Sequence, residues 1–234
     1  MATTMQLSDL QAAIFQRADM VGSQFVSTPE LTSYINQSYF ELYDLLVSAY
    51  GEDYFVASPA YTVTTDGVSE LFALPSDFYK LLGVDLQVTP QQWMTLKPFA
   101  FSERNKHSYP NYQSPYGITN LRYRPQGNFL WLRPLPMGAQ TLRLWYVPKL
   151  APLVNGTDTV DGVSGWTEYI IVDGAIKCLQ KQESDVSVLM AQKQALAIRI
   201  LEMAENRDVG TAMRVADVRG DGGDWNGYGF GESY

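Results

Sequence analysis

Hydrophobic positions recur every three or four residues near both ends of the chain and every second residue in its middle. Near the N-terminus, Leu7, Leu10 and Ile14 follow the helical spacing. The run Thr28-Pro29-Glu30 then offers a capping hydroxyl, a proline at the first helical position and an early acid, which together predict a helix start. The helical spacing continues to Ala49. Residues 1–58 are therefore predicted to supply two helices of a bundle.

The second of these predicted helices carries two apolar stripes. Phe40, Tyr43 and Val47 lie about 100° around the helix from Leu42 and Leu46, because each residue turns the helix by that angle. One interpretation is a single wide stripe that faces the core. The other is that one stripe faces the core and the second packs on a neighbouring subunit. On that interpretation Phe40, Tyr43 and Val47 are candidate subunit-interface residues.

Residues 59–152 read as strands. Val84, Leu86 and Val88 alternate with polar residues, as half-buried antiparallel strands do. Eleven of the 12 prolines lie between positions 59 and 152, and proline breaks helix interiors. Gln126-Gly127-Asn128 is a good turn between two such strands. This region is predicted to be an inserted antiparallel sheet or sandwich.

Residues 153–209 return to helical spacing. Trp166 and Tyr169 begin one predicted helix, and Ser184 begins a second that runs through Leu196 and Ile200. The short link between them predicts an antiparallel helical hairpin. This hairpin would complete a bundle with the N-terminal helices. The predicted fold class is therefore α+β, a helical bundle with an inserted antiparallel β-rich region and an extended C-terminal tail.

The predicted tail, residues 210–234, combines glycine with aromatic residues. Residues 217–234 hold 6 of the 18 glycines, too many for a helix or strand to form there alone. One interpretation is a segment that folds onto a partner, with glycine for adaptability and aromatic anchors. The other is a frayed terminus. On the first interpretation the candidate partner-binding residues are Trp225, Tyr228, Phe230 and Tyr234.

Two further groups are candidate partner contacts. The stretch from Pro98 to Asn120 fits neither period, and long irregular segments in compact domains often serve function. Its tyrosines bring large contact area with few torsions. Beyond it, two arginines are predicted to share one sheet face, either as a solvated surface or as an ion-pairing surface for a partner. These candidates are Tyr109, Tyr112, Tyr116, Arg122 and Arg124.

Composition argues against several classes of function. The 234 residues carry a net charge of −8, which is unsuited to a protein that binds nucleic acid by neutralising phosphates. The single cysteine, Cys178, excludes an intramolecular disulfide, and the single histidine, His107, argues against a zinc site built on imidazoles. No grouping of residues suggests catalysis. We therefore expect a protein that is not an enzyme and uses no cofactor or metal.

The sequence also lacks the signals of membrane insertion and export. No apolar run approaches the roughly 20 residues that a membrane helix needs. The N-terminal segment from Met1 to Met5 carries no basic region of the kind that opens a secretion signal. We expect no membrane partner.

The order of helices, strand-rich insertion, helical hairpin and glycine/aromatic tail resembles a bacteriophage head-to-tail adaptor, and more narrowly the tail-tubular-protein-A-like class. The likeness covers roughly residues 5–215. The segments that carry it are Ile35-Asn36-Gln37-Ser38 running into Glu41–Val47, Tyr50–Phe55, Leu74–Lys80, Gly127-Asn128 before Leu130, Tyr146-Val147-Pro148, and Trp166.

The resemblance implies a structural virion protein made in the cytoplasm of a host bacterium. It implies a homo-oligomeric ring of twelve subunits at the head-tail junction, with the portal protein on one side and tail or nozzle proteins on the other. Double-stranded DNA would only pass through the lumen, where an acidic wall repels phosphates. It makes the portal the expected partner of the tail aromatics. The alternative is a carbohydrate- or ligand-binding tail-associated module, suggested by the Trp and Tyr content of residues 93–146.

Overall fold

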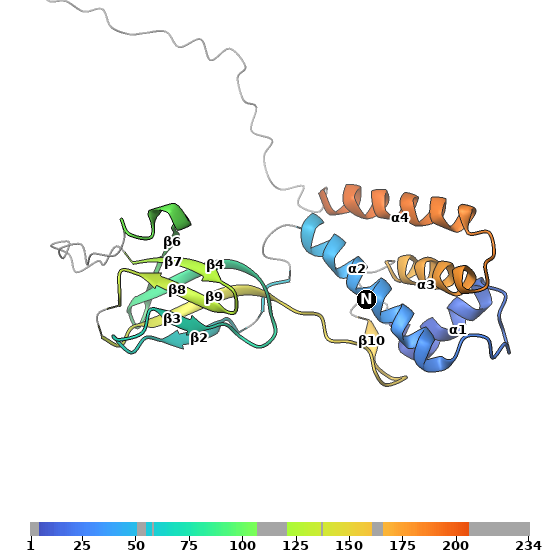
Figure 1. Cartoon of the computed structure of the whole chain (residues 1–234), viewed down its shortest axis with the longest axis horizontal. Helices are drawn as coiled ribbons and strands as arrows, with labels where there is room; N and C mark the ends of the chain where they lie inside the picture. Colours follow the sequence, from blue (N-terminus) through green and yellow to red (C-terminus); the bar gives the residue numbers. More distant parts are fainter. Residues whose placement is uncertain are drawn as a thin grey trace, which may run out of the picture.

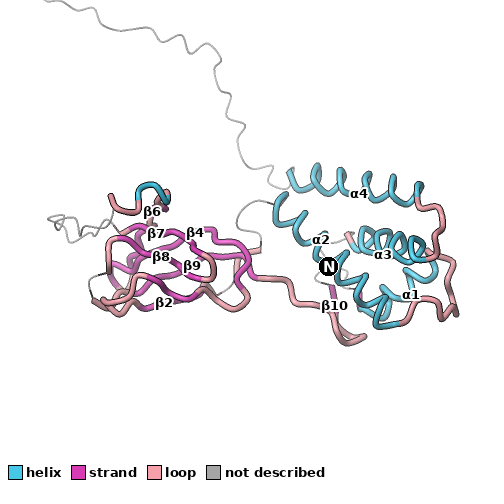
Figure 2. Tube along the Cα trace, viewed as in Figure 1, coloured by secondary structure: helices cyan, strands magenta, loops and turns pink. Residues whose placement is uncertain are grey.

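The chain forms two bodies, one of helices and one of strands. The computed structural model describes residues 5–50, 55–57, 59–106, 121–136, 138–160 and 166–205. Figure 1 shows four helices gathered on one side and most of the strands on the other, and Figure 2 shows the same separation by element type. The predicted α+β class is confirmed. The predicted tail, residues 210–234, lies outside the described residues.

The helical body contains α1 to α4 together with one two-stranded pair. Its helices are α1 (Leu7–Arg17), α2 (Thr28–Ala49), α3 (Thr167–Lys181) and α4 (Ser187–Glu205). Helix α2 packs on α3 and α4, and α1 packs on α2 and α3. The shared core is apolar and includes Leu10, Ile14, Leu31, Ile35 and Ile200, each with no exposed surface. The helical spacing in the sequence therefore marks the faces that meet in this core.

Two predicted helix starts are shifted. Residue Thr28 already belongs to α2, and the N-cap is Ser27, whose side chain makes no capping hydrogen bond. Helix α4 begins at Ser187 rather than at Ser184. The Asp185 carboxylate accepts hydrogen bonds from the backbone N–H and the hydroxyl of Ser187 (2.9 and 3.1 Å). Asp185 thus satisfies the free donors at the start of the helix, so the preceding residues remain in the link.

A close approach of backbone to side chain joins α1 to α3. A Cβ atom on Gly174 would lie 2.5 Å from Cδ1 of Ile14, closer than any real contact. The absence of a side chain at position 174 therefore lets α1 lie directly on α3. Beside this contact, β1 (Met5–Gln6) pairs antiparallel with β10 (Thr159–Val160) and ties the start of α1 to the segment that precedes α3.

The sheet body consists of two four-stranded sheets that share one apolar core. The first has the order β2-β9-β4-β5 and the second β3-β8-β7-β6. The strands are β2 (Tyr61–Thr64), β3 (Leu71–Ala73), β4 (Phe78–Thr89), β5 (Gln92–Thr95), β6 (Lys97–Pro98), β7 (Arg122–Gln126), β8 (Phe129–Arg133) and β9 (Thr141–Pro148). Residues of both sheets fill the space between them, among them Val84, Leu86, Leu130, Leu132 and Leu144.

The period of two predicted the strand through Val84 and Leu86, and the turn at Gln126-Gly127-Asn128 predicted a hairpin. The hairpin from β7 to β8 is confirmed, and Gly127 takes a φ of 57° in its turn, a conformation that favours glycine. The prediction that Val88 points into the core with Val84 and Leu86 is wrong. Val88 is 50% exposed, because the β4–β5 pairing shifts register between Gln87 and Thr89. Strand β6 pairs parallel to β7, and a short 3-10 helix, η1 (Phe101–Glu103), follows β6.

Candidate interaction surfaces

The two bodies meet at a small junction between α2 and the long strands β4 and β9. The chain crosses between the bodies twice, after Ala49 and after Pro148. Tyr43 and Val47 of α2 pack on Val147 of β9 in a separate apolar cluster. The hydroxyl of Tyr43 donates a hydrogen bond to the carbonyl oxygen of Pro148 (2.7 Å). Burial raises the pKa of Tyr43 to about 12, so this hydroxyl stays protonated as a donor.

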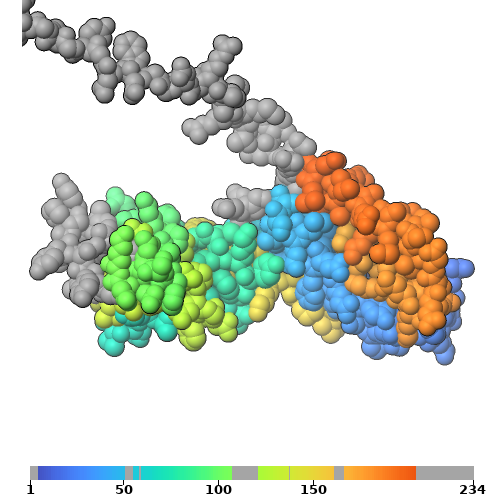
Figure 3. All heavy atoms as spheres, turned by 45° about the horizontal axis from the view of Figure 1, so that its top comes forward, coloured from blue at the N-terminus to red at the C-terminus, as the bar shows by residue number. Residues whose placement is uncertain are grey.

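A second hydrogen bond spans the same junction. The hydroxyl of Tyr79 on β4 donates to the Asp44 carboxylate on α2 (2.7 Å). Figure 3 shows the two bodies as separate masses that touch near the end of α2. The apolar cores of the bodies do not merge, since each cluster contains residues of one body alone. The junction therefore positions two largely independent bodies.

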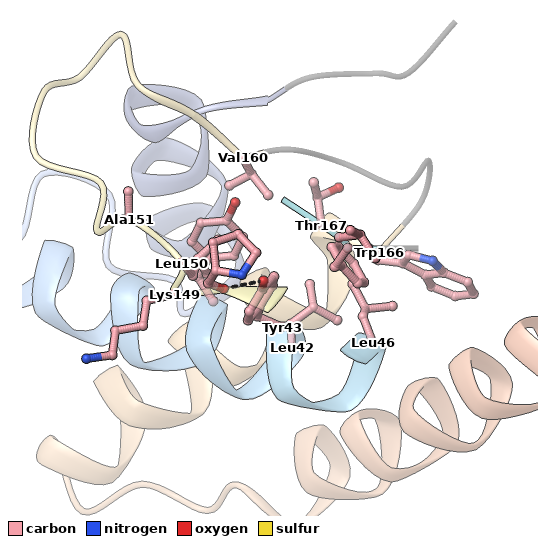
Figure 4. A pocket seen from close by; sticks show the side chains of 13 residues that line it. Leu42, Tyr43, Leu46, Lys149, Leu150, Ala151, Val160, Trp166 and Thr167 are labelled. Atoms are coloured by element: carbon pink, nitrogen blue, oxygen red, sulfur yellow. Dashed lines mark hydrogen bonds between the residues drawn. The ribbon is translucent and has the colours of Figure 1, made fainter. Parts of the chain in front are cut away.

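A cavity of about 320 Å³ opens beside this junction. Figure 4 shows its apolar lining, to which α2 contributes Leu42, Tyr43 and Leu46, while the side chain of Lys149 points away from the group. Trp166 closes another side, and its indole N–H donates to the Tyr50 hydroxyl (3.1 Å). The Tyr43 hydroxyl is already engaged with Pro148. The lining thus offers apolar contact but few polar groups that could position a reacting molecule.

A buried carboxylate joins three helices of the helical body. Asp173 of α3 is 3% exposed. Its carboxylate accepts hydrogen bonds from the Ser38 hydroxyl of α2 (2.6 Å) and from the ammonium groups of Lys177 (2.6 Å) and Lys193 (2.8 Å). Lys193, on α4, also contacts the carboxylate of Glu41 (2.6 Å). The network therefore fixes α2, α3 and α4 relative to one another.

Opposing effects act on the pKa values of this network. Desolvation alone would raise the pKa of Asp173, but the hydrogen bonds from Lys177, Lys193 and Ser38 together lower it below its ordinary value. Desolvation likewise opposes charge on Lys193, whereas Asp173 and Glu41 raise its pKa. Both groups stay charged and mutually paired near neutral pH. The network is suited to structure, since its members are bonded to one another.

The arginines of the strands lie on two different sheets. Arg122 and Arg124 flank the buried Tyr123 on β7 and therefore share the outer face of that sheet, as the alternation predicted. Arg133 lies opposite Arg122 and pairs with the Glu70 carboxylate (2.9 Å). Positive charge is thus concentrated on this face.

Aromatic rings accompany these guanidinium groups. Arg133 lies 4.8 Å from the ring centre of Trp131. On the other sheet, Arg143 lies 3.7 Å from the ring centre of Trp93 and 5.5 Å from that of Trp145. The arginines therefore form two amphipathic patches, in each of which aromatic rings lie beside a cation. One interpretation of the sequence was a sheet face on which the arginines contact only solvent, and these ring contacts differ from it.

The structure separates the three candidate subunit-interface residues. Tyr43 and Val47 are buried in the junction of their own chain, and Phe40 is 39% exposed. Only Phe40 thus offers a large part of its side chain to another molecule, and a role for it in subunit contact stays a prediction. The other candidates, Tyr109, Tyr112, Tyr116, Trp225, Tyr228, Phe230 and Tyr234, lie outside the described residues, as does His107.

The outer face of α4 was not among the sequence candidates. Val188 is 69% exposed and Ile198 is 57% exposed, although both are large apolar residues. The helical spacing predicted this helix, but the sequence alone did not show which of its faces would remain uncovered. One feature of the sequence could have indicated it: apolar residues occur all round this helix. Such a helix is typically buried on more than one side.

The described residues contain no metal cluster or membrane-spanning helix. Within those ranges, no three side chains of His, Cys, Asp or Glu lie together as possible metal ligands. None of the described helices combines the length and the apolar character required to cross a membrane. The described residues thus form a protein of two bodies, with exposed apolar or cationic surfaces on both.

A family of known proteins shares this sequence pattern. The profile of the SU10 adaptor protein family matches residues 5–219. The chain therefore belongs to the SU10 adaptor protein family, and it is a structural bacteriophage adaptor that assembles with head and tail components of the virion. No curated protein matches the chain significantly. The match covers both the helical body and the sheet body. The likeness to the family therefore extends over the whole described fold.

Proposed function

We propose that this protein is the head-to-tail adaptor of its phage, of the tail-tubular-protein-A-like class. Twelve copies form a ring at the head-tail junction, with the portal protein on one side and tail or nozzle proteins on the other. DNA passes through the lumen during packaging and ejection. The observation that carries this proposal is the family match over residues 5–219. The protein performs no catalysis in this role.

Charge and surface character support the proposal. The net charge of −8 suits a wall that DNA must pass without adhering, because like charges repel phosphates. Subunits of a ring present different faces to their two neighbours. Exposed apolar side chains such as Phe40 and Ile198 lie on different helices of the body and are available for such contacts.

The proposal assigns the tail aromatics to the portal and the irregular segment to other partners. Trp225, Tyr228, Phe230 and Tyr234 would insert into a crevice of the portal. Tyr109, Tyr112 and Tyr116, together with Arg122 and Arg124, would contact tail proteins. The acidic carboxylates of a partner would suit the cationic face that Arg122 and Arg124 share.

Removal of the tail tests the portal contact. A chain that ends at Asp217 is expected to be retained on immobilised portal rings at least about tenfold less than the full chain, since aromatic anchors dominate binding energy. A full-length variant with the four aromatics replaced by serine is expected to lose binding equally, and Ser233→Ala to retain it. Undiminished retention of the shortened chain would refute the tail contact. Absence of any portal binding by the full chain would refute the adaptor role.

A second candidate function rests on an open pocket of about 680 Å³ on the sheet body. Phe101 and Trp131 line it together with Glu70, Arg104 and Asn105. Flat rings beside planar polar groups are suited to a carbohydrate, as in a tail-associated binding module. Phe101 is 52% exposed, which leaves its ring accessible for stacking on a sugar.

A glycan-binding assay discriminates this second candidate. If the pocket binds host polysaccharide, Phe101→Ala is expected to weaken binding about tenfold by loss of stacking. Phe129→Ala is the matched control, because Phe129 is similarly exposed (46%) and does not line the pocket. Lack of binding to fragments of the host surface polysaccharide would remove this candidate and leave the adaptor function unaffected.

A further inference from the structure

The outer face of α4 is the largest concentration of exposed apolar side chains in the described residues. Seventeen large hydrophobic residues are exposed in those ranges, and five of them belong to this one helix: Val188, Met190, Ile198, Leu201 and Met203. The opposite face of α4 packs on the core through Leu189, Leu196 and Ile200. Figure 1 shows α4 along the edge of the helical body, with α2 and α3 on one side of it only. The side of α4 that no other described element covers thus carries large apolar side chains, which it shares with the exposed polar residues Gln194 and Glu202.

The spacing of the exposed residues is that of a helix-helix seam. Val188, Ala191, Ala195 and Ile198 follow one another at intervals of three, four and three residues, and all four are exposed. This is the a/d spacing by which one helix receives another. The two alanines at the centre allow a close approach of the backbones. A helix, rather than a strand or loop, is therefore the element that this face fits.

The order of sizes along the seam is the same in both directions. It reads large, small, small, large from Val188 to Ile198. A copy of the same helix, laid antiparallel, therefore brings valine against isoleucine at each end and alanine against alanine in the middle. Such self-complementarity is what a two-fold symmetric contact requires.

We propose that a second copy of this chain covers this face, with the two α4 helices antiparallel and related by a two-fold axis level with residue 193. Val188 of each copy packs on Ile198 of the other, and Ala191 packs on Ala195.

Charge is compatible with this register. In the antiparallel arrangement Arg199 of one copy lies level with residue 187 of the other, within reach of the exposed Asp185 carboxylate, and symmetry makes two such pairs. Gln192 and Gln194 flank the centre, so no like charges face each other there. Lys193 points away from the seam, because its ammonium group is bonded to Asp173 and Glu41.

The pairing is a state of the free protein, separate from the ring, and it does not rest on the proposed function. A two-fold contact closes with two copies, whereas a ring with cyclic symmetry is built from head-to-tail contacts. Pairing through α4 would keep the apolar face from water until the protein joins its assembly. The free protein uses Ile198 for pairing, and the ring would use the same side chain only after the pair separates. Pairing can therefore be tested on the free chain, without the portal.

Sedimentation of the purified full chain provides the first test. A dimer is expected, and Ile198→Glu is expected to weaken dimerisation at least about tenfold because it places a charge in the apolar seam. Val154→Glu is the control, since Val154 is also well exposed (71%, against 57% for Ile198) but lies in the loop before β10. Circular dichroism checks that both variants keep their helices. A protein that remains monomeric at high micromolar concentration would overturn the proposal.

Disulfide trapping then tests the register. The natural Cys178 is buried and burial raises the pKa of its thiol to about 11, so it competes little. A mixture of Ala191→Cys and Ala195→Cys chains is expected to give crosslinked heterodimers, while each variant alone crosslinks weakly. Efficient crosslinking of Ala191→Cys with itself would indicate a parallel seam, and absence of crosslinking in the mixture would indicate another interface. Either result refutes the antiparallel pairing, whatever the outcome of portal binding.

Discussion

Replacing Asp173 by alanine is expected to lower the free energy of unfolding of the helical body by about 3–5 kcal/mol, the range for breaking a buried charge pair. The carboxylate is 3% exposed and accepts hydrogen bonds from Ser38, Lys177 and Lys193. Its removal leaves two partly buried ammonium groups without this partner. It also removes the charge that joins α4 to α3. The effect therefore exceeds that of an ordinary surface substitution several-fold.

Urea denaturation followed by circular dichroism at the helix band measures this loss. Asp9→Ala is the matched control, because Asp9 is an exposed acid in the first turn of α1 and interacts mainly with the helix dipole. The control is expected to lose under about 1 kcal/mol. A loss for Asp173→Ala no greater than that of the control would show that the network contributes little to stability.

The pH dependence of the same difference gives an independent check. The folded state lowers the pKa of Asp173 below the ordinary value of 3.8, so folding favours the ionised carboxylate. This stability is fully present above the pKa of the unfolded chain and is lost as the pH falls through the folded pKa. The difference between wild type and Asp173→Ala is therefore expected to be constant near neutrality and to shrink below about pH 3.8. An unchanged difference in acid would contradict a charge-based role.

Replacing Leu144 by alanine is expected to destabilise the sheet body by about 2–5 kcal/mol, through lost apolar burial and a residual cavity. Leu144 lies in the centre of β9, has no exposed surface and packs between the two sheets. The helical body has its own core, and the contacts described between the two bodies lie at the junction, where Tyr43 and Val47 pack on Val147 and Tyr79 donates to Asp44. The damage is therefore expected to stay in the sheet body.

Two spectroscopic signals separate the bodies. Trp93, Trp131 and Trp145 are on strands, whereas Trp166 is buried in the core of the helical body. In a chain that carries Trp166→Phe, tryptophan fluorescence therefore reports mainly on the sheet body, and the helix band reports on α1 to α4. Leu144→Ala is expected to shift the fluorescence transition and leave the helix transition in place. Val88→Ala, at a site that is 50% exposed, is expected to change stability by no more than about 0.5 kcal/mol. A joint shift of both signals would show that the bodies unfold as one unit.

Local sequence signals predicted those elements whose geometry is decided locally. Helix α2 follows from Pro29, Glu30 and the helical spacing of its core residues. The β7–β8 hairpin follows from Gly127, because its positive φ is a local requirement of the turn. In both cases the residues that fix the structure are neighbours in sequence.

Contacts between distant segments could not be predicted in this way. The pairing of β1 with β10 joins residues far apart in the chain, and each strand has only two residues, too few for any period to appear. Val88 kept the alternation in the sequence but lost its inward position through a register shift in the fold. Burial of Tyr43 and Val47 depends on the docking of β9, which the pattern of α2 alone does not contain.

The same limits apply to the candidate surfaces. The alternation predicted the face that Arg122 and Arg124 share, but only the topology shows that Arg133 lies on the same sheet and Arg143 on the other. It predicted the helices of the hairpin, but the uncovered face of α4 depends on which sides α2 and α3 occupy. The role of Asp173 depends on Ser38 and Lys193, which lie on other helices and far from it in the sequence.

The insertion of the sheet body between α2 and α3 sets an order of events during synthesis. The strands β2 to β9 are contiguous in sequence, so the ribosome releases everything that the sheet body needs before α3 is made. Helices α1 and α2 emerge first but must wait for α3 and α4 to cover their apolar faces. At the usual rate of roughly 5–20 residues per second, this interval lasts several seconds. In each nascent chain, α1 and α2 are thus made first, but their apolar faces are buried last. During this interval these faces are the part of the chain most in need of a chaperone.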